Sequence, residues 1–154
     1  MKVVFLDFDG VLNSAKYDRR KRYGDPSLDR SRMPLLRKLI EKTDAKVVLT
    51  TSWRVYWEAD IAHCDEVGRD MVAFFAEYGL TIADKTPRLG ALMRPREIME
   101  WLSHHPEVSR YVILDDMDIS WGMMLSPYVV KTDYEEGSGL EEWHIARAIE
   151  LLNA

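Results

Sequence analysis

The sequence predicts an α/β fold in which helices cover both faces of a parallel sheet of about five strands. Short β-branched segments alternate along the chain with segments whose apolar residues recur at helical spacing. The apolar runs VVFL, VVL and YVIL are uninterrupted, as expected of strands that are buried on both faces. A length of 154 residues is typical of one domain, so we expect residues 1–154 to form a single domain. Strand–helix alternation of this kind predicts right-handed crossovers and a doubly wound sheet.

Short apolar segments rich in β-branched residues are predicted as the strands. They are Lys2–Leu6, Lys46–Thr50, Leu80–Ala83, Tyr111–Leu114 and Tyr128–Lys131.

Helices are predicted between the strands and after the last one. They are Arg32–Thr43, Val67–Tyr78, a segment that begins at Pro95, and Leu140–Leu152. Pro34 lies in the first turn of the first helix, where its missing N–H group costs nothing. Gly79 follows the second helix, at a position where helices commonly end.

Composition favours a globular domain of the cytoplasm. Apolar residues make up 47% of the chain, which is ordinary for a folded protein. The net charge of −5 argues against wholesale wrapping by nucleic acid but leaves a local basic patch open. The single cysteine, Cys64, cannot form an internal disulfide, which is typical of a reducing compartment. No apolar run reaches the roughly 20 residues that a membrane helix needs, so we expect no contact with membranes.

Polar residues end three of the predicted strands. The first strand runs into Asp7-Phe8-Asp9-Gly10, the second into Thr50-Thr51-Ser52, and the fourth into Asp115-Asp116 with Asp118 close behind. In doubly wound sheets, ligands bind beyond the carboxyl ends of the strands. Carboxylates that converge there repel one another unless a cation lies among them. Oxygen ligands suit a hard ion such as Mg²⁺, so the sequence predicts a magnesium and phosphate site at this edge.

The segments FLDFDGVLN, VVLTTSWR and VILDD, in this order, resemble the haloacid dehalogenase (HAD) superfamily of phosphohydrolases. The resemblance extends from Lys2 to about Leu152 and implies a Rossmann-like HAD fold. The letters SWR after the second strand are similar to a subgroup of small HAD domains associated with nucleic-acid repair proteins.

The resemblance implies catalytic roles for the first aspartates. Asp7 would attack phosphorus and form an aspartyl-phosphate. Asp9 would protonate the leaving oxygen and then activate water, and its main-chain carbonyl would bind Mg²⁺. Thr51 would bind the phosphate through its hydroxyl, with the Ser52 amide beside it, and Thr50 and Ser52 are the register alternatives for the hydroxyl.

The remaining implied roles concern metal and charge. Asp116 corresponds to a direct metal ligand, Asp115 to a ligand through water, and Asp118 to a further candidate. The superfamily places a lysine near the start of the helix before the fourth strand, where it binds the phosphate and neutralises its charge and that of the nucleophile, but this chain has none there. Arg94 is the expected substitute, and Lys85 is its competitor.

Two basic features leave alternatives open. Arg54 would either reach a substrate phosphate from the rim of the site or pair with a surface acid. The segment KYDRRKRY follows FLDFDGVLN in the chain. It is either a flap that contacts a polyanionic substrate or a solvated loop. Its basic residues are Lys16, Arg19, Arg20, Lys21 and Arg22, and its aromatic residues are Tyr17 and Tyr23.

The loops leave no room for a large cap domain, and in this superfamily an open site goes with large substrates. We therefore expect a Mg²⁺-dependent phosphomonoesterase whose phosphorylated substrate is a nucleotide or a nucleic-acid end. The alternatives are a phosphatase of a small metabolite or of a phosphoprotein, and a phosphate-binding regulatory module without catalysis. Screening phosphorylated compounds with and without Mg²⁺ would separate them.

Overall fold

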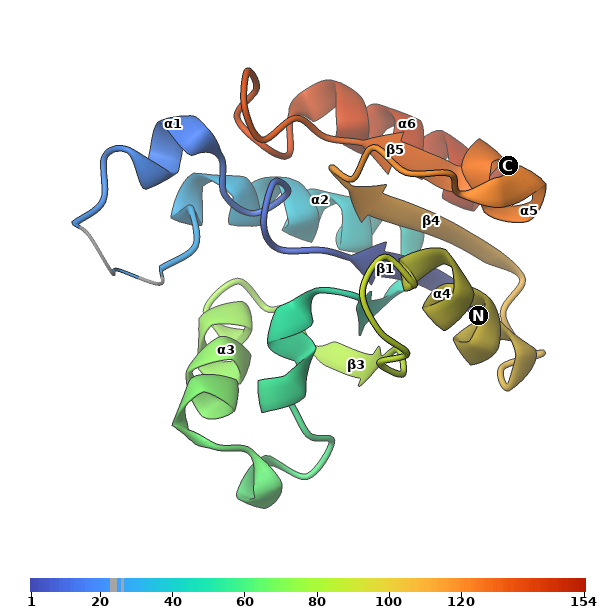
Figure 1. Ribbon diagram of the computed structural model, residues 1–154, viewed down its shortest axis with the longest axis horizontal. Coiled ribbons are helices and arrows are strands. Elements are labelled where there is room, and N and C mark those ends of the chain that lie inside the picture. Colours follow the sequence, from blue (N-terminus) through green and yellow to red (C-terminus); the bar gives the residue numbers. More distant parts are fainter. Residues whose placement is uncertain (23–24, 26) are drawn as a thin grey trace.

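The computed structural model describes residues 1–22, 25 and 27–154, and these form one parallel five-stranded sheet in the order β3-β2-β1-β4-β5 (Figure 1). The strands are β1 (Lys2–Leu6), β2 (Lys46–Leu49), β3 (Ile82–Lys85), β4 (Arg110–Asp115) and β5 (Val129–Lys131). The predicted α/β fold is confirmed. The buried apolar runs form strands covered on both faces, since every residue of β1 after Lys2 is buried.

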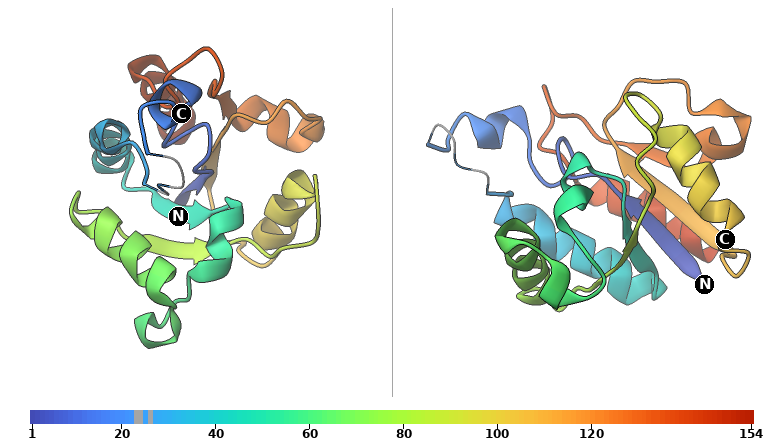
Figure 2. Two further views of the ribbon diagram at one scale, coloured as in Figure 1. Left: turned by 60° about the vertical axis from the view of Figure 1, so that its left-hand side comes forward. Right: turned by 60° about the horizontal axis from the view of Figure 1, so that its bottom comes forward.

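Helices cover both faces of the sheet (Figure 2). The α-helices are α1 (Ala15–Asp18), α2 (Met33–Thr43), α3 (Glu66–Ala76), α4 (Arg94–Ser103), α5 (Gly122–Leu125) and α6 (Glu142–Asn153). Alternate side chains of the strands divide the core. Val4 and Leu6 pack with α2, α3 and α6, whereas Val3 and Phe5 pack with α4 and α5.

The register of the three central strands positions the functional edge. Leu6 of β1 lies beside Leu49 of β2 and Leu114 of β4. The residues that follow are therefore level with one another: the Asp7 amide donates to the Leu114 carbonyl at 3.1 Å, and the Thr50 amide donates to the Leu6 carbonyl at 3.0 Å. Polar residues that are far apart in sequence thus meet at one edge of the sheet.

One strand lies later in the sequence than predicted. The expected strand Leu80–Ala83 is found as β3 at Ile82–Lys85. Leu80 instead donates its amide to the Phe75 carbonyl at the end of α3 and packs into the core. Its apolar character therefore reflects helix-end packing, which a β-like pattern in sequence does not distinguish from a strand.

Within the described residues, the connections after β1 and β2 hold only α1 and short 3₁₀ turns besides the helices α2 and α3. This agrees with the expectation that the domain has no large cap. None of the helices in the described part of the chain combines the length and apolarity needed to cross a membrane.

Candidate active site

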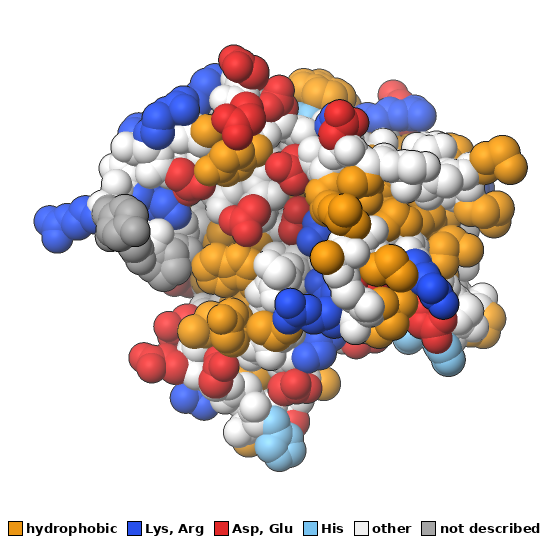
Figure 3. Space-filling model, viewed as in Figure 1, with side chains coloured by type: hydrophobic (Ala, Val, Ile, Leu, Met, Phe, Trp, Pro, Cys, Tyr) orange, Lys and Arg blue, Asp and Glu red, His pale blue; other side chains and the backbone are white. Residues whose placement is uncertain are grey.

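Three aspartates meet at the carboxyl edge of the sheet. Asp7 follows β1, Asp115 is the last residue of β4, and Asp116 follows it. One carboxylate oxygen of each lies within 4.8 Å of the others. Asp7 and Asp115 are buried, and Asp116 is partly exposed. Figure 3 shows acidic side chains gathered on this side of the molecule, with basic side chains over α1. We call Asp7, Asp115 and Asp116 the acidic centre.

Arg94 is the basic residue that reaches the acidic centre. It begins α4, and its Nη1 atom lies 2.8 Å from Asp7 Oδ2 and 2.7 Å from Asp115 Oδ2. Lys85, the competing candidate, points elsewhere: its Nζ atom donates to the Trp57 carbonyl at 2.7 Å. Two basic side chains were candidates for the position that a lysine occupies in the HAD superfamily. The structure brings Arg94, and not Lys85, to the aspartates.

The electrostatics of the acidic centre are unbalanced, because one guanidinium faces three carboxylates. Burial and the neighbouring charge of Asp115 raise the pKa of Asp7 to about 7, although Arg94 and the Phe8 amide oppose this shift. Burial and Asp115 also raise the pKa of Asp116. A bound cation would remove this repulsion, and donor atoms that are all carboxylate oxygens suit a hard cation such as Mg²⁺.

The acidic centre opens into a shallow pocket of about 270 Å³. Its lining combines the residues expected at a phosphate site with two that the sequence did not indicate. They are Asp7, Asp9, Ser52, Arg94, Asp116, Met117 and Tyr134. The pocket is open to solvent, so it leaves space for a substrate larger than phosphate.

Asp9 lies at the mouth of this pocket with its side chain exposed, and two neighbours hold it in place. The Asn13 side-chain amide donates to Asp9 Oδ1 at 2.8 Å, and the Trp53 indole donates to Oδ2 at 3.3 Å. Asn13 was not considered, although its position four residues after Asp9, on the turn that follows the strand, is the available signal.

Gly10 allows the turn after β1 to pack closely against Asp116, which follows β4. Its φ of +84° lies in the left-handed region, and a Cβ atom there would overlap the Asp116 carboxylate. The Gly10 amide donates to Asn13 Oδ1 at 2.8 Å, and its carbonyl accepts from Thr132 Oγ1 at 2.6 Å. The glycine of the DxDG motif is thus required by close packing against an aspartate of the site.

The three hydroxyl residues after β2 occupy different environments. Ser52 lines the pocket of the acidic centre. Thr51 is fully buried, and its Oγ1 accepts from the Trp53 amide at 3.3 Å, capping a 3₁₀ turn, η2 (Ser52–Tyr56). Thr50 is also buried, and its Oγ1 has no hydrogen-bond partner among the described residues. Of the three, Ser52 is therefore the residue that lines the pocket.

Arg54 does not lie at the rim, and the two roles considered for it from sequence need correction. The side chain is buried and forms an ion pair with the buried carboxylate of Glu97 on α4. It also donates to main-chain carbonyls, at 3.1 Å to Thr86 and 2.9 Å to Thr51. Its guanidinium is thus engaged by partners inside the protein. One of them, Glu97, is distant in sequence, and only the packing of α4 places it beside Arg54.

The basic segment around α1 is split between two surfaces. Lys16, Arg19 and Arg20 line a groove of about 570 Å³ together with Arg32, separate from the acidic centre. Tyr17 points away from this groove, and its hydroxyl donates to the Leu28 carbonyl at 3.0 Å. Aromatic and basic residues of this segment therefore face different surfaces.

Lys21 and Arg22 of the same segment and Asp118 are the remaining predicted contacts. Lys21 pairs with Asp18 at 2.9 Å, Arg22 is exposed, and Tyr23 lies outside the described residues. Asp118 is exposed and pairs with Lys131 at 3.3 Å. Asp118 therefore does not join the acidic centre.

A doubly wound sheet with aspartates following its first and fourth strands, and without a large cap, defines the HAD class of domain. The family model for the HAD domain in Swiss Army Knife RNA repair proteins matches residues 3–144, and the chain belongs to this family. The resemblance inferred from sequence is thus confirmed. Comparison with curated proteins and with solved structures returned no match. Family membership and the acidic centre together support a HAD-type hydrolase.

Proposed function

We propose that the protein is a Mg²⁺-dependent phosphomonoester hydrolase that works through an aspartyl-phosphate on Asp7. The observation that carries this proposal is the acidic centre itself: three aspartates and one arginine around a shallow pocket, with Asp9 at its mouth. Such a concentration of uncompensated carboxylates destabilises the folded chain. Clusters of this kind are typical of functional sites, and binding of a cation here would offset their repulsion.

In the first step, a carboxylate oxygen of Asp7 attacks phosphorus. The P–O bond to the alcohol breaks, and Asp9 donates its proton to the leaving oxygen. Asn13 and Trp53 hold the Asp9 side chain toward the pocket, which suits a group that must meet the leaving oxygen at a fixed position.

In the second step, water attacks the phosphorus of the aspartyl-phosphate. Asp9, now ionised, accepts a proton from this water, and the bond between phosphorus and the Asp7 oxygen breaks. Inorganic phosphate leaves, and both aspartates return to their starting states. One residue thus serves as acid and then as base.

The carboxylates of Asp7 and Asp116 and the carbonyl of Asp9 would hold Mg²⁺, with Asp115 acting through water. Bound there, the ion would supply positive charge that stabilises the phosphoryl oxygens as they develop negative charge. Arg94 adds a second positive charge from the chain, and Ser52, which lines the pocket, is the proposed hydroxyl contact to phosphate.

A nucleotide or a nucleic-acid end is the substrate we favour. The matched family is described as a domain of RNA repair proteins, and the pocket is open enough for a terminal phosphate on a polymer. A small phosphorylated metabolite or a phosphoprotein is the alternative, and a phosphate-binding module without catalysis is the rival from another class. The free, buried Cys64 is in keeping with a cytoplasmic location.

The decisive experiment is a hydrolysis screen. Phosphorylated nucleotides, oligonucleotides and sugars are incubated with the protein in EDTA, in Mg²⁺ and in Ca²⁺, and released phosphate is measured. We expect hydrolysis only with Mg²⁺, and inhibition by Ca²⁺ because its larger and more flexible coordination misplaces the phosphate. Full activity in EDTA, or no activity with any phosphomonoester, would refute the proposal.

Contacts between α1 and a nucleic-acid backbone are tested separately. Replacing Arg19 and Arg20 by Gln should raise KM for a phosphorylated oligonucleotide, because these side chains line a basic groove away from the reacting phosphate. Oligonucleotide KM should also rise steeply between roughly 50 and 200 mM salt. If a sugar phosphate responds to salt and substitution as strongly as the oligonucleotide does, α1 makes no polymer-specific contact.

A further inference from the structure

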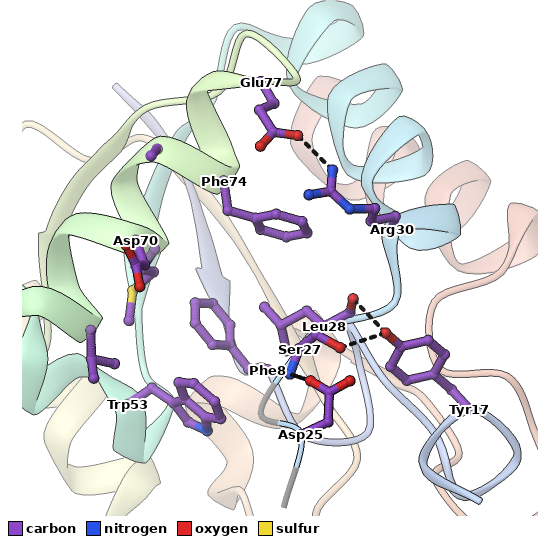
Figure 4. Close-up of a pocket in the computed structure, with 13 residues that line it drawn as sticks. Phe8, Tyr17, Asp25, Ser27, Leu28, Arg30, Trp53, Asp70, Phe74 and Glu77 are labelled. Atoms are coloured by element: carbon purple, nitrogen blue, oxygen red, sulfur yellow. Dashed lines mark hydrogen bonds and ion pairs between the residues drawn. The ribbon is translucent and has the colours of Figure 1, made fainter. Parts of the chain in front are cut away.

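A second pocket, of about 520 Å³, lies between α3 and the residues just before α2, which include Ser27, Leu28 and Arg30 (Figure 4). We call it the aromatic pocket. Phe74 and Trp53 line one side, Leu28 and Tyr17 the facing side, and Phe8 lies between them. Its volume is in the range of pockets that bind small organic molecules, and its apolar lining suits a flat ring.

Two residues of the aromatic pocket, Phe8 and Trp53, connect it to residues that line the pocket of the acidic centre. Phe8 separates Asp7 from Asp9 in the chain, and its ring lines the aromatic pocket while the carboxylates on either side line the pocket of the acidic centre. Trp53 also serves both places, because its ring lines the aromatic pocket and its indole N–H donates to Asp9 Oδ2 at 3.3 Å. The two pockets are therefore linked by the sequence Asp7-Phe8-Asp9 and by the hydrogen bond from Trp53 to Asp9.

The polar residues of the aromatic pocket are mainly acceptors. Asp25, Asp70 and Glu77 contribute carboxylates, and the one lining arginine, Arg30, is paired with Glu77. This charge disfavours a phosphate inside the aromatic pocket. It favours a ring that carries N–H groups, since carboxylates accept hydrogen bonds from the exocyclic amino groups of bases.

We propose that the aromatic pocket binds the nucleobase of the nucleotide whose phosphate lies at the acidic centre. This inference rests on the proposed function and adds the substrate class: a base with an exocyclic amino group, from a mononucleotide or from the end of an oligonucleotide. The base packs between Phe74 and Trp53 on one side and Leu28 on the other, and Asp70 accepts its N–H groups. A phosphotyrosine ring would fill the space but would offer the carboxylates no donor.

The test measures equilibrium binding in an Asp7→Asn background with Mg²⁺, so that no ligand is turned over. Calorimetry compares guanosine 5′-monophosphate, uridine 5′-monophosphate, ribose 5-phosphate, a phosphotyrosine peptide and a 5′-phosphorylated dinucleotide. Guanosine monophosphate should bind at least about tenfold more tightly than ribose 5-phosphate, because stacking on an aromatic side chain is worth roughly that factor or more. The dinucleotide shows whether a polymer end is accepted as well as a free nucleotide.

Two substitutions in the aromatic pocket, and one control outside it, test where the base binds. Phe74→Ala should weaken guanosine monophosphate binding by about tenfold. Tyr128→Ala, which removes another half-buried aromatic ring from an aromatic pair outside this pocket, should not. Asp70→Asn should weaken binding of guanosine monophosphate more than that of uridine monophosphate, and this milder change keeps the test valid if Phe74→Ala does not fold.

Equal affinity for ribose 5-phosphate or the phosphotyrosine peptide, or unchanged binding in Phe74→Ala, would overturn the inference. The two proposals fail separately. If phosphomonoesters are hydrolysed but nucleotide binding does not depend on Phe74 and Asp70, only the base pocket is wrong. If nucleotides bind through Phe74 but no phosphomonoester is hydrolysed, only the hydrolase proposal is wrong.

Discussion

Two arginine–carboxylate clusters involve the first turn of α4, and they differ in charge balance. Arg54 and Glu97 form a buried one-to-one pair, and Arg54 also donates to carbonyls on both sides. Arg94, three residues before Glu97, faces Asp7 and Asp115 with Asp116 beside them. One cluster is neutral and satisfied, whereas the other keeps excess negative charge.

We infer that this difference separates a structural cluster from the proposed binding site. A buried ion pair whose donors and acceptors are all engaged has nothing left to offer a ligand, and it serves to hold elements together. Carboxylates that outnumber their cations need a further positive charge, and burial makes that need stronger. Charge balance, rather than the presence of arginine, therefore distinguishes the proposed site from the Arg54–Glu97 pair.

The largest expected effect comes from neutralising the attacking group. Asp7→Asn keeps the size and much of the hydrogen bonding of Asp7 but removes its nucleophile, so phosphomonoester hydrolysis should fall by at least about 10³. Released phosphate measures the loss, and circular dichroism checks the fold. A variant within tenfold of the wild-type rate would exclude the aspartyl-phosphate mechanism.

Breaking the balanced cluster should instead cost stability. Glu97→Ala leaves the buried Arg54 guanidinium without its charge partner, and such losses cost about 3–5 kcal/mol. Urea denaturation measures the free energy of unfolding. Glu100→Ala, on the exposed side of the same helix, is the control and should change it by less than about 1 kcal/mol. Equal effects of the two substitutions would contradict the structural role of the Arg54–Glu97 pair.

Metal dependence should distinguish the members of the acidic centre from their neighbour. Asp116→Ala should raise the Mg²⁺ concentration needed for half-maximal hydrolysis by at least about tenfold, because it removes a proposed direct ligand. Asp118→Ala should leave that concentration unchanged, since the Asp118 side chain is 95% exposed and pairs with Lys131. Similar shifts for both variants would place the metal elsewhere.

The smallest effect concerns pH and stability without metal. The pKa of Asp7 is raised to about 7 in the folded chain, so between about pH 4 and 7 the folded state binds more protons than the unfolded state. The free energy of unfolding in EDTA should therefore decrease as pH rises through this window. Asn at this position cannot ionise, so Asp7→Asn should unfold a few degrees higher than wild type at pH 8 and nearly equally at pH 4.

Thermal unfolding in EDTA at both pH values measures this difference, and Mg²⁺ should reduce it by stabilising the wild type at pH 8. An Asp7→Asn variant that is less stable than wild type at pH 8 in EDTA would show that Arg94 compensates the Asp7 charge fully. The acidic centre would then resemble the Arg54–Glu97 cluster in charge balance.

The sequence by itself determined the α/β class of the fold and the polar residues at the ends of β1, β2 and β4. Apolar runs such as VVFL and YVIL extend along one strand each, so local patterning identifies them, and the aspartates directly after them share an edge in any parallel sheet of this kind. Asp7, Asp115 and Asp116 could therefore be predicted to meet, and the structure brings them together.

Only the tertiary structure decided how the arginines are used. Arg54 and Arg94 were both candidates for contact with phosphate, but burial and partners come from α4, which carries Glu97 to Arg54 across 43 positions of sequence. The same holds for α1, where one turn of helix directs Tyr17 and Arg19 to different surfaces. Charge is a property of a residue, whereas its neutralisation depends on neighbours that folding supplies.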